Sequence, residues 1–542
     1  MSLSLALAMF IILSLLMILR IINMKAFLTG LFASLSITAV HASDLMEQTV
    51  TISDAYTAEI HVDEMAYFRG SIESERPLGV AKIVDVDGNV VKTIVDYGQR
   101  DGELFWFVKQ PGLYTLEIDS IEKDNRVTIK INEKSLKSDQ YVNPKEALIS
   151  PLLMALEKQL QIDPEYETTF WQQIKSKGTP LVEPNIDGSA IVTFLWRGDE
   201  NNVRLFGAPY DGHVYLSRLG ESSVWYKSYQ LPNGTRMSYR FAPNVPQLSS
   251  LEWIEQRRAV LATAQTDPLN IRPIFAASQD KFGDASTLEF GDVPSDQYTK
   301  ESGAPSGEVL TYQFDSRVLA NQRSIKVYLP NATHRVERDA PLLIVFDGDQ
   351  YLTRVPTPTI LDNLIAAREI PPLRAVFINH PTNKLRGKEL PPNQDFAKFL
   401  ATELVPWLKQ EFQIEPKAET TILTGSSYGG LASMYIAHQY PQIFGNVLSQ
   451  SGSFWWAPSR LQKEWLIDQI SHSPQNSIKV YMNAGLFELK PDRASIIETN
   501  RKLYKVLQDK QYDVKFDELA SGHDYYSWRV TFANGLDYLF EN

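Results

Sequence analysis

The chain has 542 residues, which is too long for a single hydrophobic core. Of these residues 44% are apolar and 22% are charged, a composition typical of globular proteins. It contains no cysteine, which excludes disulfide bonds, a cysteine nucleophile and cysteine-ligated metals. The formal net charge of −12 argues against nucleic acid as a partner, and any anionic substrate would need a local basic patch.

Two apolar runs, residues 3–19 and 26–40, occupy the start of the sequence. The second follows the order of a secretory signal peptide: the basic residue Lys25, an apolar stretch, and small residues up to Ala42 as a cleavage site. We therefore expect residues 1–42 to be a signal-peptide region and the mature protein to be periplasmic or secreted.

Met24 directly precedes this pattern, and we interpret it as the natural start, with residues 1–23 as an upstream extension of the reading frame. The alternative is an uncleaved membrane anchor formed by residues 3–22, which are just long enough to span a bilayer. Cleavage would remove two basic residues and leave 51 basic against 65 acidic ones, a net charge of −14. After cleavage we expect no stable membrane insertion.

Residues 44–135 consist of short runs in which polar and apolar residues alternate, separated by Asp-Gly and Pro-Gly pairs. A period of two with many β-branched residues predicts a small antiparallel β-sandwich. The closing sequence PGLYTLEI resembles the β-sandwich domains of the pre-peptidase C-terminal type found beside secreted bacterial hydrolases, which implies an accessory role.

The remaining sequence changes character twice. Residues 136–165 combine a linker with a short helix, and residues 166–300 form a second β-rich domain. Its end, residues 280–308, is rich in Gly, Ser, Pro and Asp without an apolar period, so we expect a loose boundary there. From 305 to 542, apolar strand-like runs alternate with helix-like segments, which predicts a mostly parallel sheet with helices on both faces. The expected fold is multidomain, with a C-terminal α/β domain behind two β-rich domains.

A nucleophile motif lies in this last domain. The strand-like run 421–424 leads into GSSYG, residues 425–429, and then into a helix-like segment. G-x-S-x-G between a strand and a helix is typical of the α/β-hydrolase nucleophile, and the helix N-terminus favours developing negative charge. We predict Ser427 as the nucleophile, because Ser426 occupies the x position. The plainer interpretation is a tight Gly-Ser turn without a chemical role.

The general base is expected after the acid, since this fold orders its triad serine, acid, histidine. His523 follows the last predicted strand, where a loop can bring an imidazole over the nucleophile. His472 lies in a polar loop before a strand, and His438 lies on the nucleophile's helix as a surface or packing residue. We predict His523 as the base.

The acid should follow the strand IKVYMNAG. Glu488 stands three residues past Gly485, the end of that strand, whereas Asp492 follows Pro491 and is interpretable as a helix cap. We favour Glu488, with the role of orienting the imidazole and stabilising its protonated form.

Two backbone N–H groups are expected to form an oxyanion hole. One is that of Tyr428, and the other is that of Asp349 in the loop after PLLIVF, with Gln350 close behind. The pair Asp347 and Asp349 also resembles a cation site, but without further ligand spacing we interpret it as a hydrogen-bonded loop. No metal or other cofactor is expected.

Several stretches resemble the enterochelin (ferric enterobactin) esterases, within the wider esterase D group. The resemblance covers about residues 166–542 and leaves out residues 44–135. The matching stretches in the α/β domain are GSSYGGLASMYIAHQYPQIFGNVLSQSGSFWW, FDGDQYL, LRGKELPPNQDF and SGHDYYSWRVTFANGL, and those upstream are FWQQIKSKGTPLVEP, VTFLWRG, VWYKSYQLPNGTRMSYRFAP and DPLN.

This resemblance implies hydrolysis of the ester bonds of a trilactone catecholate siderophore, so that its iron can be released. The family's catalytic serine, glutamate and histidine correspond to Ser427, Glu488 and His523.

The family's basic substrate residue corresponds to Arg386. A ferric tris-catecholate is a trianion, so Arg386 with nearby Lys388 is expected to supply a local positive site on an acidic protein. Arg197 is a further candidate that could reach the cleft from the neighbouring domain. For these residues an ordinary surface ion pair remains the alternative.

Three other functions share these features. An exported carboxylesterase or feruloyl-type esterase would use the same triad, and a siderophore-binding protein would keep it as a vestige. A peptidase of the same fold has no positive sign in the sequence. The best-known members of the family act in the cytoplasm, so an exported member would differ in where iron is released.

Overall fold

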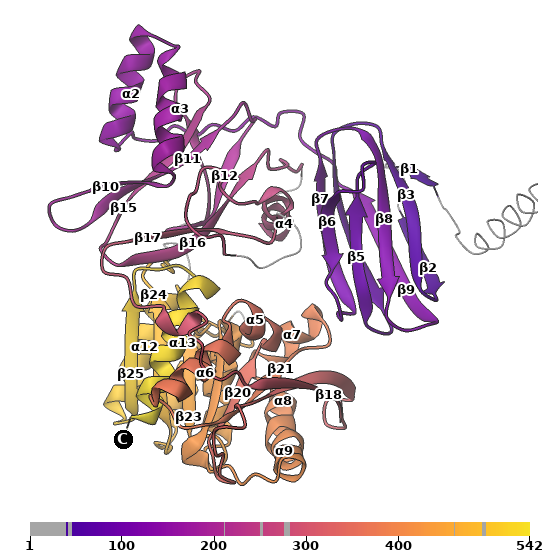
Figure 1. Cartoon of the computed structure of the whole chain (residues 1–542), viewed down its shortest axis with the longest axis vertical. Helices are drawn as coiled ribbons and strands as arrows, with labels where there is room; N and C mark the ends of the chain where they lie inside the picture. Colours follow the sequence, from indigo (N-terminus) through magenta and orange to yellow (C-terminus); the bar gives the residue numbers. More distant parts are fainter. Residues whose placement is uncertain are drawn as a thin grey trace, which may run out of the picture. The chain divides into compact units, whose positions relative to one another are not determined.

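The structure is a computed structural model that describes residues 39–41, 46–210, 212–249, 253–275, 282–459, 461–489 and 495–541. The expected signal-peptide region, apart from residues 39–41, and the alternative acid Asp492 lie outside the described residues. Within these ranges no helix is long and apolar enough to cross a membrane. The chain divides into two compact units, one ending at Lys134 and the other comprising Ser135–Asn542 (Figure 1).

The first unit consists of two β-sheets, with strand orders β1-β3-β8-β5-β6 and β2-β9-β4-β7. Alternate side chains are buried along its strands, for example Ile60 of β3, Leu116 of β8 and Ile129 of β9. This arrangement agrees with the period of two in the sequence. The strands are β1 (Ala39–His41), β2 (Met46–Ile52), β3 (Ala55–Val62), β4 (Ala66–Ser74), β5 (Leu78–Val84), β6 (Val90–Val95), β7 (Asp101–Val108), β8 (Gly112–Ser120) and β9 (Asn125–Glu133).

The second unit begins with two helices on a β domain. Its two four-stranded sheets have the orders β10-β11-β15-β14 and β13-β12-β16-β17. The elements are α2 (Pro151–Ile162), α3 (Tyr166–Lys177), β10 (Leu181–Pro184), β11 (Ala190–Arg197), β12 (Val203–Ala208), β13 (Gly212–Tyr215), β14 (Ser217–Arg218), β15 (Val224–Leu231), β16 (Thr235–Pro243), α4 (Trp253–Thr263) and β17 (Ser286–Phe290).

Helix α2 belongs to this domain, so the expected boundary at residue 166 is misplaced. The Ser150 hydroxyl accepts a hydrogen bond from Leu153 N at 3.2 Å, and Pro151 suits the first helical position, so the helix begins there. Leu153 and Leu156 are buried in one apolar cluster with α3 and with Leu195 of β11. The segment joins the domain's core instead of acting as a linker.

The boundary stretch 280–308 is also more ordered than expected. It contains β17, which pairs antiparallel with β16, and Leu288 of β17 is fully buried opposite Met237. The short apolar signal was hidden because the residues around STLEF are polar and rich in glycine. The short helix η1 (Gln297–Thr299) follows it.

The α/β domain is built on an eight-stranded sheet with the order β18-β19-β21-β20-β22-β23-β24-β25. Strands β18 and β19 pair antiparallel, and the strands from β21 to β25 in this order are parallel. The strands are β18 (Glu308–Ser316), β19 (Asn321–Leu329), β20 (Leu342–Phe346), β21 (Arg374–Ile378), β22 (Thr421–Ser426), β23 (Asn446–Gln450), β24 (Lys479–Gly485) and β25 (Asp513–Leu519).

Helices cover both faces of this sheet (Figure 1). Leu342, Ile344 and Phe346 of β20 enter one buried cluster, while Leu343 and Val345 enter a second cluster on the opposite face. The helices are α5 (Gly348–Thr353), α6 (Thr357–Ala367), α7 (Asn383–Glu389), α8 (Gln394–Phe399), the π-helical turn η2 (Leu400–Leu404), α9 (Val405–Glu411), η3 (Ala418–Thr420), α10 (Tyr428–Gln439), α11 (Trp465–His472), α12 (Ile496–Asp509) and α13 (Tyr525–Phe540).

The parallel strands bring the predicted catalytic residues to one edge of the sheet. Ser427 follows β22, Glu488 follows β24 and His523 follows β25. Because the carboxyl ends of parallel strands lie at the same edge, the loops that carry these three side chains emerge there together.

Candidate active site

Ser427 occupies a strained turn between β22 and α10. Its backbone has φ 57° and ψ −117°, a conformation that L-residues rarely adopt. Two backbone hydrogen bonds hold it: Ser427 N donates to Gln450 O at 2.9 Å, and Ser453 N donates to Ser427 O at 3.0 Å. This is the geometry expected of a nucleophile on a strand-to-helix turn.

Small residues make this turn possible. A Cβ on Gly425 would lie 2.9 Å from Gly429 Cα, and one on Gly430 would lie 2.6 Å from Ser449 Oγ. Helix α10 can therefore pack closely against the strands only with glycine at these positions. Ser426, the rejected neighbour, is 1% exposed and lies beside Tyr351 and away from solvent.

The Ser427 hydroxyl lies 3.2 Å from the hydroxyl of Ser453, a contact that the sequence analysis did not predict. Ser453 is 1% exposed and follows β23 in a run of small residues, SQSGS. This run of small residues was the available sign that the segment could approach the nucleophile. It could not be interpreted from the sequence, because that requires knowing that β22 and β23 are neighbours in the sheet.

Glu488 and His523 are in direct contact. His523 Nδ1 lies 2.5 Å from Glu488 Oε1, and Gly485 N donates to Glu488 Oε2 at 3.0 Å. The Glu488 side chain is 2% exposed and that of His523 is 37% exposed, so the carboxylate is buried behind an accessible imidazole. This arrangement suits a carboxylate that fixes the tautomer of a general base.

Two features keep the loops of Glu488 and His523 together. A Cβ on Gly485 would collide with Ser521 O, so glycine at the end of β24 allows the two loops to approach. The ring of Trp528 on α13 packs edge-on against His523 with 4.8 Å between centroids, and its Nε1 donates to Ser451 Oγ at 3.0 Å. Trp528 therefore connects the histidine to the loop that carries Ser453.

The two rival histidines have ordinary structural surroundings. The His472 side chain is 78% exposed and pairs with Asp468 on its own helix. His438 Nδ1 is 3.1 Å from Asn476 Nδ2, and burial lowers the pKa of its imidazole. Neither is paired with a buried carboxylate, as His523 is with Glu488.

Of the two predicted oxyanion donors, only the Tyr428 N–H is available, because the Asp349 N–H is already hydrogen-bonded. Tyr428 is the first residue of α10, so its N–H has no acceptor within that helix and remains a candidate donor. The Asp349 N–H donates to Asn379 Oδ1 at 2.8 Å, and the Gln350 N–H donates to Asp347 O at 2.9 Å. The expectation for Asp349 is therefore wrong, because its amide is used within the fold.

The acidic pair in this loop is bound to cations of the protein. Asp349 Oδ1 lies 2.6 Å from Lys326 Nζ, and both Asp347 oxygens accept from Arg386, from Nε and Nη2, at 2.6 Å each. Among the described residues no group of three or more His, Asp or Glu side chains is placed to hold a metal ion.

Arg386 lies near the nucleophile, but Asp347 neutralises it. Burial opposes its charge, yet the carboxylate of Asp347 outweighs burial and raises the pKa of the guanidinium. Its charge also acts on Tyr428, where it opposes the rise in pKa that burial causes. The guanidinium is therefore close to the site as half of an ion pair.

Lys388 and Arg197 lack the expected placement. Lys388 is exposed and two residues from Arg386 on α7, and residues at that spacing do not share a helix face. Arg197 is exposed and stands 5.6 Å from the centroid of Trp171 on α3. Arg197 is the last residue of β11. The first residue, Ala190, pairs with the end of β15, just before the turn into β16, and β16 contacts the α/β domain through Arg236. Arg197 thus lies at the far end of the strand, and the structure contradicts its reach into the site.

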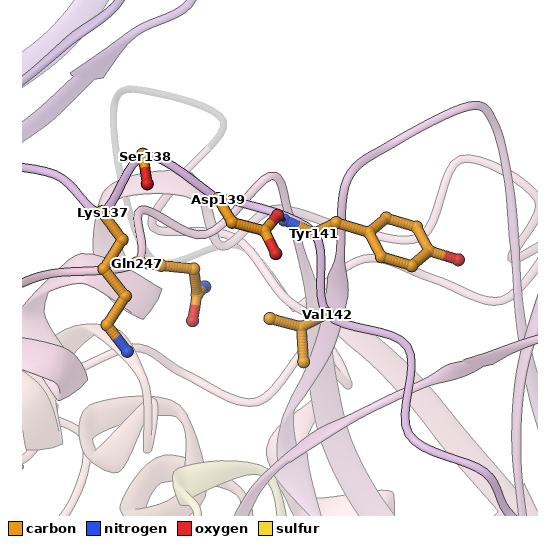
Figure 2. A pocket seen from close by; sticks show the side chains of 6 residues that line it. All are labelled: Lys137, Ser138, Asp139, Tyr141, Val142 and Gln247. Atoms are coloured by element: carbon orange, nitrogen blue, oxygen red, sulfur yellow. Dashed lines mark hydrogen bonds between the residues drawn. The ribbon is translucent and has the colours of Figure 1, made fainter.

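A depression of about 410 Å³ lies elsewhere in the second unit, where residues 137–142 cross the β domain beside Gln247 (Figure 2). Two of its polar side chains are hydrogen-bonded within the fold: Gln247 Oε1 accepts from Tyr215 at 2.7 Å and Asp139 Oδ1 accepts from Tyr141 N at 2.8 Å. None of its lining residues belongs to the catalytic group.

Two family models match the second unit. Residues 316–539 match that of the putative esterases, and residues 191–299 match that of the N-terminal domain of enterochelin esterases. In both domains that these models cover, the chain is similar to the enterochelin esterases. It is an ester hydrolase, and the family models leave the first unit unmatched.

Curated relatives and solved structures agree with this assignment. The iron(III) enterobactin esterase of Dickeya dadantii is 29% identical over 415 residues, covering 69% of this chain and 93% of the relative. The iron(III) salmochelin esterase of Escherichia coli is 25% identical over 395 residues, with 69% and 93% covered. The crystal structure of the enterobactin esterase of Shigella flexneri in the presence of enterobactin has a TM-score of 0.55 at 26% identity and covers 68% of this chain and 97% of that one. For the ferric enterobactin esterase of Salmonella typhimurium the TM-score is 0.57 at 25% identity, with 69% and 98% covered.

Proposed function

We propose that the protein is an exported serine esterase that hydrolyses the ester bonds of a trilactone catecholate siderophore of the ferric enterobactin type, so that its iron can be released. The observation that carries the proposal is the buried Glu488 carboxylate, 2.5 Å from His523, at the sheet edge where Ser427 occupies its strained turn. The relatives named for enterobactin and salmochelin hydrolysis supply the substrate class.

In the proposed reaction Ser427 Oγ attacks a lactone carbonyl carbon while His523 Nε2 takes the hydroxyl proton. Glu488 accepts the Nδ1–H and stabilises the imidazolium. The Tyr428 N–H donates to the carbonyl oxygen as it becomes negative. The imidazolium then protonates the leaving alkoxide, which leaves Ser427 acylated.

Water completes the cycle. His523 removes a proton from water, the resulting hydroxide attacks the acyl carbon, and Ser427 recovers its proton as the carboxylic acid leaves. No metal cofactor takes part in this scheme, because iron enters as part of the substrate.

Aromatic side chains beside the nucleophile suit a substrate with catechol rings. Tyr428 follows Ser427 directly, and its ring centroid lies 6.0 Å from that of Trp455, which is 37% exposed. Such flat surfaces stack favourably against aryl groups. With Arg386 paired to Asp347, we propose that ring stacking contributes more to binding than a free positive charge does.

Export is proposed from the signal-like sequence ending at Ala42 and agrees with the absence of cysteine. The enzyme would then act on siderophore outside the inner membrane. N-terminal sequencing of protein recovered from a periplasmic extract tests this, and a mature N-terminus near residue 43 supports it. Protein retained in membranes with residues 3–22 intact contradicts it.

The deciding experiment is liquid-chromatographic product analysis after ferric enterobactin is added to purified protein, with Ser427→Ala as the matched control. Stepwise appearance of the linear trimer, dimer and monomer, abolished in the variant, supports the proposal. An intact macrocycle with rapid turnover of feruloyl or other simple aryl esters favours the alternative carboxylesterase. Tight binding of the ferric siderophore without any turnover favours a binding protein.

A further inference from the structure

Beyond the triad, we infer that Arg236 of the β domain is a positioning residue for the catalytic histidine. It is the second residue of β16 and is 2% exposed. The inference concerns the same active site and rests on the proposed serine-esterase chemistry, but not on the identity of the substrate.

The backbone of Arg236 holds the segment around His523 from both sides. Its N–H donates to Ala520 O at 3.0 Å, and its carbonyl accepts from Ser527 Oγ at 3.0 Å. Ala520 lies three residues before His523, and Ser527 lies four residues after it. One residue of the β domain therefore fixes both ends of the loop that presents the imidazole.

The side chain adds a second set of contacts to the same segment. Arg236 Nε donates to Tyr526 O at 3.2 Å, and its guanidinium lies 3.9 Å from the centroid of the Tyr526 ring. On its other side it pairs with Glu289, and Nη2 stands 3.7 Å from Asp296. Glu289 also accepts a hydrogen bond from the Tyr526 hydroxyl at 2.8 Å, so each of Arg236, Glu289 and Tyr526 contacts the other two.

The loop that carries Glu488 also packs against the β domain. Phe487, next to Glu488, and Ala520 are both buried within the apolar cluster of that domain. The Phe487 ring meets Tyr210 edge-on with 5.1 Å between centroids. The loops that carry Glu488 and His523 are thus both seated on the β domain.

These contacts make the β domain part of the catalytic framework. Misplacement of a catalytic group by about 1 Å can reduce turnover by about 100-fold. Loss of the Arg236 side chain would release Tyr526 and loosen the loop of His523, while Ser427 and the surfaces next to it would remain. We therefore expect an effect on turnover with little effect on substrate binding.

The test compares Arg236→Gln and Arg236→Lys with the control Arg240→Gln in the full chain. Arg240 lies on the same strand, where it donates to Phe282 O at 2.6 Å and lies 4.8 Å from the Phe206 ring. The readouts are kcat and KM for p-nitrophenyl butyrate, the rate at which a fluorophosphonate labels Ser427, and the thermal unfolding midpoint.

For Arg236→Gln we expect kcat and the labelling rate to fall roughly 10- to 100-fold, with KM within about three-fold of wild type. Arg236→Lys should recover part of the loss, because it keeps the cation. Arg240→Gln should stay within about three-fold of wild type. Equal kcat for the two glutamine variants, or a fall explained by the unfolded fraction, would overturn the inference.

If Arg236→Gln does not fold, Ser527→Ala removes the hydrogen bond to the Arg236 carbonyl while the arginine stays in place. A fall in kcat of roughly three- to ten-fold at unchanged unfolding midpoint supports the inference, and an unchanged kcat overturns it. Failure of wild-type protein to turn over the aryl ester or to be labelled would instead refute the serine-esterase chemistry. Failure on ferric enterobactin alone would refute only the substrate assignment.

Discussion

The hydroxyl of Ser453 lies 3.2 Å from the hydroxyl of the nucleophile Ser427, and the N–H of Ser453 donates to the Ser427 carbonyl at 3.0 Å. Two serines that follow the neighbouring strands β22 and β23 are therefore coupled through both backbone and side chain. Either hydroxyl can donate, so Ser453 can hold the nucleophile's oxygen in place before the substrate arrives.

We expect Ser453→Ala to lower kcat about three- to ten-fold, because it removes one hydrogen bond to the reacting oxygen. Ser473→Ala is a suitable control, since Ser473 donates to Ile470 O at the end of α11. Steady-state kinetics on an aryl ester check the effect. Equal kcat values for the two variants would show that the contact has no catalytic role.

Replacing Glu488 by glutamine should be far more damaging. The amide keeps the size of the side chain but no longer stabilises the imidazolium, and it can favour the wrong imidazole tautomer. We expect Glu488→Gln to lower kcat by roughly 1,000-fold and Asp492→Asn to stay within about three-fold of wild type. A larger loss for Asp492→Asn would reverse the assignment of the acid.

Asp524, the N-cap of α13 beside His523, should make stability depend on pH. Burial raises the pKa of its carboxyl from 3.8 to about 6, against the backbone N–H of Ser527. Because the folded state holds this proton more tightly, the contribution is fully present below pH 3.8 and is lost as the pH rises through about 6.

Asp524→Asn removes this titration and keeps an oxygen that can accept from Ser527 N. Relative to the variant, wild type should lose about 1–3 kcal/mol of stability between roughly pH 4 and pH 7. Thermal unfolding of both proteins across this range measures the difference. Parallel curves would contradict it.

The Arg386–Asp347 pair should show strong coupling. Removing Arg386 leaves the buried carboxylate of Asp347 unpaired, and removing Asp347 leaves the partly buried guanidinium of Arg386 unpaired. The double variant Arg386→Gln/Asp347→Asn leaves neither charge behind. We expect each single variant to destabilise the protein by about 1–3 kcal/mol and the double variant by less than the sum. Denaturant unfolding of the four proteins gives the coupling energy, and additive effects would argue for independent roles.

The sequence was sufficient for features set by local chemistry. The turn at Ser427 follows from a buried strand, two flanking glycines and a helix, all within a few residues. The Glu488 position follows from the end of β24, since short loops carry side chains only a small distance from the sheet edge. The mostly parallel sheet of the α/β domain follows from the alternation of strands and helices, whereas β17 of the β domain was missed in its polar surroundings.

Contacts between distant residues could not be predicted in this way. Asn379 uses the N–H of Asp349, Trp171 takes the guanidinium of Arg197, and both depend on how separate elements align. The contact between Ser527 and Arg236 joins residues 291 positions apart. No local pattern marks such pairs, because either partner alone is an ordinary polar residue.

Gly485 places a limit on which substitutions the chain can tolerate. It touches neither ester nor transferred proton, yet any larger residue there would meet Ser521 O and push the loop of Glu488 away from that of His523. Screening of random variants should therefore find this position as intolerant as the triad itself. A selection for activity would then mark as essential a residue that has no side chain to take part in the reaction, because the missing Cβ leaves room for a neighbouring loop.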